Sequence, residues 1–204
     1  MTSRVTVGYF LEDIAQERFI TGLVLRVASE LGLAVRNEVR NASGGKGRAI
    51  AELRAFLRDV SRSMTSTYDV LVVAIDGNCN TYQGRRREIE KAREHAGYGG
   101  CIVCAVPDPH IERWYLADAE GFRQAIAGSQ PVPLPAYKCE RARYKQALRE
   151  AVRAAGIELQ LGGAEFAQDI VETMNLYRAG QVDAAFKHFI DDLRAALGPL
   201  ARKG

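Results

Sequence analysis

Long apolar runs are missing from this sequence of 204 residues. No stretch reaches the roughly 18 consecutive apolar residues that a membrane-spanning helix needs, so we expect no contact with a membrane. Residues Met1–Arg4 lead into a predicted strand and do not resemble an export signal. A cytoplasmic protein is therefore the expectation.

A phosphate-binding P-loop is also missing. Residues 41–47 read Asn-Ala-Ser-Gly-Gly-Lys-Gly, whereas a P-loop needs Ser or Thr directly after its Gly-Lys pair. Here Lys46 is followed by Gly47. We interpret the stretch as a surface loop, with a backbone contact to phosphate as the alternative.

Cysteine is scarce, with only Cys79, Cys101, Cys104 and Cys139. Cys101 and Cys104 have the two-residue gap of a zinc site, but both lie in an apolar run that predicts a strand. Residues three apart on a strand point to opposite faces, so we expect unligated thiols. Since we find no export signal, we also expect no disulfide.

Neither sign of charge dominates, because 28 Lys and Arg stand against 25 Asp and Glu. This balance is compatible with a polyanionic partner and does not require one. With 47% hydrophobic residues, the chain is long enough for one sizeable core. We expect a single structural domain, with an α/β core in residues 1–130 and a helical extension in residues 131–204 packed on it.

Strands and helices are expected to alternate in the first part of the chain. Stretches rich in β-branched and aromatic residues predict strands over residues 4–11, 33–39, 70–75 and 101–106. Apolar residues at helical spacing predict helices over 14–31 and 48–61, and a third after Thr81. This alternation predicts an α/β fold with a mostly parallel sheet of about four strands flanked by helices.

The last third of the sequence is expected to be helical. Apolar residues at helical spacing predict helices over residues 139–155, 165–179 and 183–197, with Gly180 as one of the stops. Their apolar faces either close the core or supply a docking or homo-oligomer surface.

Acidic side chains follow three of the predicted strands: Glu12, Asp76 and Asp108. Because the carboxyl ends of parallel strands meet at one edge of a sheet, we expect these carboxylates to lie close together. They would repel one another without a cation between them, and carboxylate oxygens are ligands that Mg²⁺ prefers. For Asp108, which precedes Pro109, the alternative is a cap for the helix that follows.

These motifs resemble the TOPRIM domain, the metal-binding fold named for topoisomerases and primases. Glu12 after the first strand, and Asp76 with Asn78 after a buried strand, are similar to its Glu and Asp-x-Asp motifs. Residues 106–118 read Val-Pro-Asp-Pro-His-Ile-Glu-Arg-Trp-Tyr-Leu-Ala-Asp. This stretch is similar to one in a stand-alone bacterial branch related to overcoming-lysogenisation-defect type nucleases.

Two positions depart from the family pattern. Asn78 stands where the second Asp belongs, and an amide oxygen brings no charge to a metal ion. The branch also tends to have a glutamate shortly after the position of Glu12. Here Glu17 either substitutes one residue later or that ligand is missing.

The resemblance implies a nuclease that uses Mg²⁺ or Mn²⁺ to hydrolyse phosphodiester bonds. Carried over by position, Glu12 takes the place of the family's glutamate, and Asp76 with Asn78 takes the Asp-x-Asp places. On this basis we expect the following roles: Glu12 and Asp76 hold the catalytic metal, Asn78 and Asp108 complete its shell, Glu112 serves a second metal or the attacking water, Lys46, Arg85 and Arg86 position phosphates, and Asp13, Glu17 and His110 are accessory.

The implied partners are DNA or RNA, and an ATPase partner protein in a phage-defence system. The alternative is a catalytically weak TOPRIM-like module that binds nucleic acid or regulates a partner, and the change at Asn78 favours it. A third class, phosphoryl transfer to a small molecule, is weaker because no nucleoside-binding motif is visible.

Overall fold

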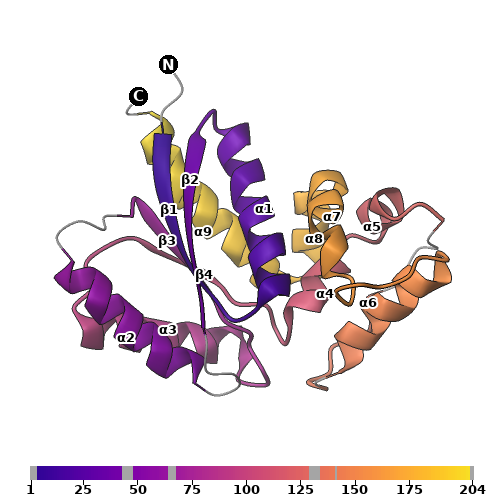
Figure 1. The fold of residues 1–204 in the computed structure, drawn as a ribbon, viewed down its shortest axis with the longest axis horizontal. Helices are drawn as coiled ribbons and strands as arrows, with labels where there is room; N and C mark the ends of the chain where they lie inside the picture. The colour runs from indigo at the N-terminus through magenta and orange to yellow at the C-terminus, as the bar shows by residue number, and fades with distance from the viewer. Residues whose placement is uncertain (1–3, 43–47, 64–67, 129–133, 141, 203–204) are drawn as a thin grey trace.

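β-Branched and aromatic residues build a four-stranded, all-parallel sheet in the computed structural model (Figure 1). The structure describes residues 4–42, 48–63, 68–128, 134–140 and 142–202. The strands, in the spatial order β2-β1-β3-β4, are β1 (Arg4–Leu11), β2 (Ala34–Asn41), β3 (Val70–Ala74) and β4 (Ile102–Ala105). The predicted α/β class and parallel sheet are confirmed.

Helices connect the strands and then extend beyond them. The crossovers are α1 (Ile14–Glu30), α2 (Ala49–Arg62) and α3 (Thr81–Ala96). After β4 come α4 (Ile111–Tyr115), α5 (Ala119–Ala125), α6 (Arg143–Ala154), α7 (Ala167–Thr173), α8 (Leu176–Val182) and α9 (Ala184–Ala201). Within the described ranges, no helix has both the length and the apolar character needed to cross a membrane.

The central strand β3 is buried on both faces. Val72 belongs to the core cluster on the side of α1 and α9, whereas Val73 belongs to the cluster formed with Leu57 of α2 and Ile89 of α3. These helices cover opposite faces of the sheet (Figure 1). Two-sided burial fixes the register of β3, since a slip by one residue would exchange its two faces.

The C-terminal helices join the same core through Trp114 of α4. Its indole ring packs edge-on to Phe186 and is stacked with Phe189, both on α9. The indole N–H donates to Asp183 Oδ1 at 3.3 Å, and Arg113 Nε donates to Asp183 Oδ2 at 2.7 Å. Because Asp183 also caps α9, one buried carboxylate ties α4 to the last helix.

One long helix was predicted over residues 165–179, and this prediction is wrong. The structure has two helices, α7 and α8, separated by an extended backbone at Met174 (φ −63°, ψ 130°). Asn175 caps α8 by accepting from Arg178 N, and its own N–H donates to Asp118 Oδ2 at 2.7 Å. The expected stop at Gly180 is also wrong, because Gly180 lies inside α8.

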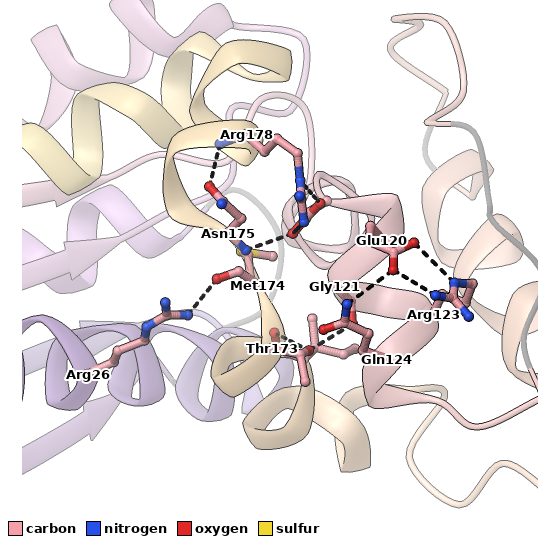
Figure 2. A network of polar contacts seen from close by, with 11 residues as sticks. Arg26, Glu120, Gly121, Arg123, Gln124, Thr173, Met174, Asn175 and Arg178 are labelled. Atoms are coloured by element: carbon pink, nitrogen blue, oxygen red, sulfur yellow. Dashed lines mark hydrogen bonds and ion pairs between the residues drawn. The ribbon is translucent and has the colours of Figure 1, made fainter.

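Neighbouring elements hold this break from both sides. Figure 2 shows the Thr173 hydroxyl bonded to the backbone oxygen of Gly121, and Arg26 reaching the backbone oxygen of Met174. The two distances are 2.7 Å and 2.6 Å. At the break itself, Arg26 satisfies the Met174 oxygen and Asp118 satisfies the Asn175 N–H, two backbone groups that a continuous helix would have satisfied internally. The Thr173–Gly121 bond ties the end of α7 to α5.

The expectation that no disulfide forms is also overturned. Cys79 and Cys139 are joined, with their Cα atoms 5.4 Å apart. The expectation rested only on the lack of an export signal. It could not take account of the fold, which brings together two cysteines that are 60 positions apart in sequence. Cys101 and Cys104 are free, the first exposed and the second buried.

Candidate functional site

The carboxylates that follow β1 and β3 meet at the carboxyl edge of the sheet. Glu12 comes directly after β1, and Asp76 follows the buried Ile75 at the end of β3. Glu12 Oε2 accepts a hydrogen bond from the backbone N–H of Asp76 at 2.7 Å. The adjacent parallel strands thus place these two carboxyl groups at one position on the edge, as expected for an open α/β sheet.

Gln16 in the first turns of α1 bridges the two acids. Its Nε2 donates to Asp76 Oδ1 at 2.8 Å and approaches Glu12 Oε2 at 3.5 Å. Its Oε1 accepts from the backbone N–H of Glu12 at 2.9 Å. Gln16 is only 1% exposed, so its amide group is a buried, hydrogen-bonded part of the site. Asp13 caps the same helix by accepting from Gln16 N.

His110, at the start of α4, adds a third element to the pair. Its Nδ1 lies 3.1 Å from Asp76 Oδ2, and both side chains are largely buried. Each oxygen of the Asp76 carboxyl group therefore has a nitrogen partner, Gln16 on one side and His110 on the other.

Burial dominates the electrostatics of the two acids. It raises the pKa of Asp76 to about 7, against the contact with His110, which lowers it; the neighbouring charge of Glu12 raises it further. Burial also raises the pKa of Glu12, although the hydrogen bond from Asp76 N–H and the charge of Arg85 lower it. Both carboxyl groups therefore resist ionisation, and a bound cation would stabilise their ionised form.

The pair opens into a cleft of about 410 Å³. Among the described residues, four acidic side chains line it, with one lysine contributed by α6. The described part of the lining is therefore predominantly acidic, with a cation at one side. Its lining comprises Glu12, Asp13, Ala42, Ala49, Asp76, Asn78, His110, Glu112, Ala142 and Lys145.

The loop from β3 to α3 has an unusual backbone. Asn78, Cys79 and Thr81 have φ values of 47°, 64° and 57°, in the left-handed region that non-glycine residues rarely occupy. Gly77 N–H donates to Pro107 O at 2.7 Å, and Asn78 N–H donates to Pro109 O at 3.0 Å. The loop is thus held against the segment that follows β4, and such held conformations often occur at functional sites.

Asp108 has a different place from the one expected of a metal ligand or of a cap for the next helix. Its Oδ2 accepts from the backbone N–H of Tyr82 at 3.1 Å, in the first turn of α3, and its Oδ1 accepts from the Tyr137 hydroxyl at 2.9 Å. It does not appear in the cleft lining, and α4 begins after His110 instead. Asp108 therefore caps a helix that precedes it in the chain.

The basic residues proposed for phosphate lie outside the cleft lining or outside the described residues. Arg85 Nε donates to the backbone oxygen of Asp76 at 2.9 Å, and its Nη1 pairs with Glu88. Arg86 bonds the Tyr82 hydroxyl and lies 3.5 Å from Asp192. Lys46 falls outside the part of the chain that the structure describes. The accessory candidate Glu17 accepts from Asn41 Nδ2 at 2.6 Å.

The side chains of the cleft do not form a complete metal site. Among the residues that the structure describes, no group of three or more His, Cys, Asp or Glu side chains is arranged to hold a metal ion. What the cleft offers is a pair of adjacent, partly buried carboxyl groups, with Asn78 and Glu112 in the same lining. That donor set matches Mg²⁺, which is usually held by one or two carboxylates, waters and substrate oxygens.

Sequence reasoning missed Gln16 and Lys145. Gln16 had a visible signal, since it lies three and four residues before Phe19 and Ile20 on the apolar face of α1. A polar side chain on that face must find buried partners. Lys145 had no such signal, because it lies 69 positions beyond Asp76 on a separate helix.

Comparison of the chain with protein-family models, with curated proteins and with solved structures gives no match. The function of the cleft therefore has to be argued from its own residues.

Proposed function

We propose that this cleft binds Mg²⁺ or Mn²⁺ and hydrolyses phosphodiester bonds in a nucleic acid, either DNA or RNA. The observation that carries the proposal is the contact between Glu12 and Asp76 at the carboxyl edge of the parallel sheet. Ligands of open α/β sheets bind at this edge, and the cleft is open to a substrate there.

A divalent cation suits the charge of the cleft. Four carboxyl groups line it, and burial raises the pKa of Asp76 and Glu12 above their ordinary values. A cation would favour the ionised form of both groups in place of a shared proton. Glu12 and Asp76 are the residues that would hold it, with the amide oxygen of Asn78 beside them.

The chain's own groups have separable roles in the reaction. When bound, Mg²⁺ supplies charge stabilisation to the phosphoryl group and acidifies a water molecule. Glu112 lines the same cleft and would accept a proton from the attacking water. Lys145 would bind a substrate phosphate, and His110 orients the Asp76 carboxyl through its 3.1 Å contact.

Cation binding is tested first and without a substrate. Calorimetric titration with Mn²⁺ should show one site in the wild type and at least about a tenfold loss of affinity in Glu12→Gln and Asp76→Asn. Glu120→Gln is the matched control, because Glu120 lies on α5, pairs with Arg123 and does not line the cleft. Equal Mn²⁺ affinity in all four proteins would remove the metal from the proposal.

Hydrolysis is tested with fluorescent single- and double-stranded DNA and RNA. We expect cleavage that requires Mg²⁺ or Mn²⁺, is lost in Asp76→Asn and Glu12→Gln, and persists in Glu120→Gln. Binding of a nucleic acid without cleavage, unaffected by these changes, would contradict the nuclease proposal.

A second candidate function is a binding or regulatory module with a weakened site. The observation that favours it is that the carboxyl oxygens of Glu12 and Asp76 already have hydrogen-bond partners within the protein. Asp76 already contacts Gln16 and His110, and Glu12 Oε2 already accepts from Asp76 N–H. An ATPase partner and a role in phage defence follow only from the TOPRIM resemblance and stay implications of it.

A further inference from the structure

The Cys79–Cys139 disulfide lies beside the candidate cleft. Cys79 directly follows Asn78, which lines the cleft, in the loop with left-handed backbone conformations. Cys139 belongs to residues 134–140, the segment that precedes α6, which we call the strap. The bond therefore connects the loop that carries Asn78 to the approach to α6.

The strap also contacts Asp108, which lies outside the cleft lining. The Tyr137 hydroxyl donates to Asp108 Oδ1 at 2.9 Å, and the other oxygen of Asp108 caps α3 at Tyr82. Lys138 N–H donates to the Tyr144 hydroxyl at 3.1 Å, which joins the strap to α6. The position of α6 matters for the cleft, because Lys145 of that helix lies in its lining.

Cys79 is exposed and Cys139 is partly exposed, so a reagent in solution can reach the bond. This distinguishes it from a disulfide inside the core. The strap keeps other contacts as well, among them Arg113 with the backbone oxygen of Pro135 at 3.4 Å. Opening the bond would therefore loosen the strap and leave the fold in place.

We propose that the Cys79–Cys139 disulfide is a thiol-exchange site through which a dithiol reductant controls the order of the candidate cleft. The thiolate of the dithiol attacks one sulfur of the bond and forms a mixed disulfide, while the other cysteine leaves as a thiolate and takes a proton. The second thiol of the reductant then attacks the mixed disulfide. The reductant ends as its own disulfide, and Cys79 and Cys139 end as two thiols.

The oxidised state is the ordered one. The crosslink holds Asn78, Cys79 and Thr81 in backbone conformations that each oppose the local preference of a non-glycine residue. Reduction removes the crosslink that helps to maintain them, so the loop gains freedom. The effect on cation binding rests on the proposed function, whereas the exchange reaction and the change in order do not.

The exchange reaction is tested on the full-length wild type under native conditions. Alkylation with iodoacetamide and peptide mapping should label the exposed Cys101 before and after treatment with dithiothreitol. Cys79 and Cys139 should be labelled only after treatment, with an unchanged far-ultraviolet circular dichroism spectrum. Opening of the bond only in denaturant would make it a structural crosslink and overturn the proposal.

Hydrogen exchange tests the change in order. The reporters are the amides of Asn78, Asn80, Tyr82 and Lys138, whose hydrogen bonds lie in the loop, in the first turn of α3 and in the strap. We expect at least about tenfold faster exchange at these amides after reduction, with β1 and β3 remaining the more slowly exchanging elements in both redox states. Equal exchange rates in both redox states would overturn the proposal.

Variants separate the disulfide from nonspecific effects of the reductant. The double variant Cys79→Ser with Cys139→Ser should match the reduced wild type without any reductant, and Cys101→Ser should match the oxidised wild type. If the double variant fails to fold, the comparison of oxidised and reduced wild type still tests the proposal.

Cation binding is the second arm of the experiment. We expect Mn²⁺ affinity to be about three- to tenfold weaker in the reduced protein, because the loop with Asn78 loses its constraint. Equal affinity in both states would overturn the control of the cleft. If neither state binds Mn²⁺, the proposed function fails, and alkylation with hydrogen exchange still decides the redox proposal.

Discussion

Replacing Asp76 by asparagine should stabilise the metal-free protein at pH 8. Burial raises the pKa of Asp76 from 3.8 to about 7 in the folded state. Since the folded pKa is the higher one, the contribution of this group to stability is complete below about pH 4 and is lost as the pH rises to 7. The difference between the two pKa values corresponds to about 4 kcal/mol in the free energy of unfolding.

The assay is urea unfolding between pH 4 and pH 8 in buffers that contain a metal chelator. The wild type should lose stability across this range, whereas Asp76→Asn should change less and exceed the wild type at pH 8. A residual slope in the variant belongs to Glu12, whose pKa burial also raises. The difference between the two proteins reports the titration of Asp76 in its contact with His110.

Other carboxylates do not mask this result. The pKa of Asp118 lies below its ordinary value, despite burial, because Arg178 and Asn175 bond its oxygens. Its contribution therefore changes below about pH 4, outside the window of Asp76. Asp59→Asn, an exposed position on α2, serves as the matched control and should follow the wild type. A wild-type stability that is level from pH 4 to 8, or a variant with the same slope, would refute the reasoning.

Three further predictions concern stability. Reducing the Cys79–Cys139 bond, which spans 60 positions, should lower the free energy of unfolding by about 4 kcal/mol in urea titrations, and a loss below about 1 kcal/mol would contradict it. Asp183→Ala should cost about 3 to 5 kcal/mol in the same assay, because it leaves Arg113 without its buried ion pair and α9 without its cap; a cost near zero would count against this. Gly121→Ala should cost about 1 to 3 kcal/mol in thermal unfolding, since the new Cβ would lie 2.8 Å from Met174 Cα (Figure 2). Gly99→Ala is its control, with nothing within 4 Å of the added atom, and equal losses in the two variants would contradict the packing argument.

The fold was predictable because local pattern and topology agree. The apolar residues of β3 are buried on both faces, as a central parallel strand requires, and the helices alternate with the strands. The meeting of Glu12 and Asp76 follows from the same rule, since parallel strands end at one edge. For these features, the sequence pattern is enough to predict how the backbone is arranged.

The details that could not be predicted depend on partners far away in the sequence. The apolar period of residues 165–179 continues across Met174, but Asp118, 57 positions before Asn175, accepts the backbone N–H that begins α8. The partner residue is invisible to any local window. A helix boundary that is set by such a tertiary hydrogen bond leaves no propensity signal of its own.

Asp108 shows the same limit within the candidate site. Its position before Pro109 favours a cap for the next helix, yet its oxygens bond Tyr82 N–H on the preceding helix and the Tyr137 hydroxyl on the strap. Both choices satisfy a carboxylate with hydrogen-bond donors, so local chemistry does not decide between them. The fold decides, because hydrogen bonds hold the loop before α3 against residues 107–109, which brings Asp108 to the first turn of that helix. One carboxylate thereby joins α3 to the strap, and the Cys79–Cys139 disulfide joins the loop just before α3 to the same strap. These two links make the strap a structural neighbour of the cleft.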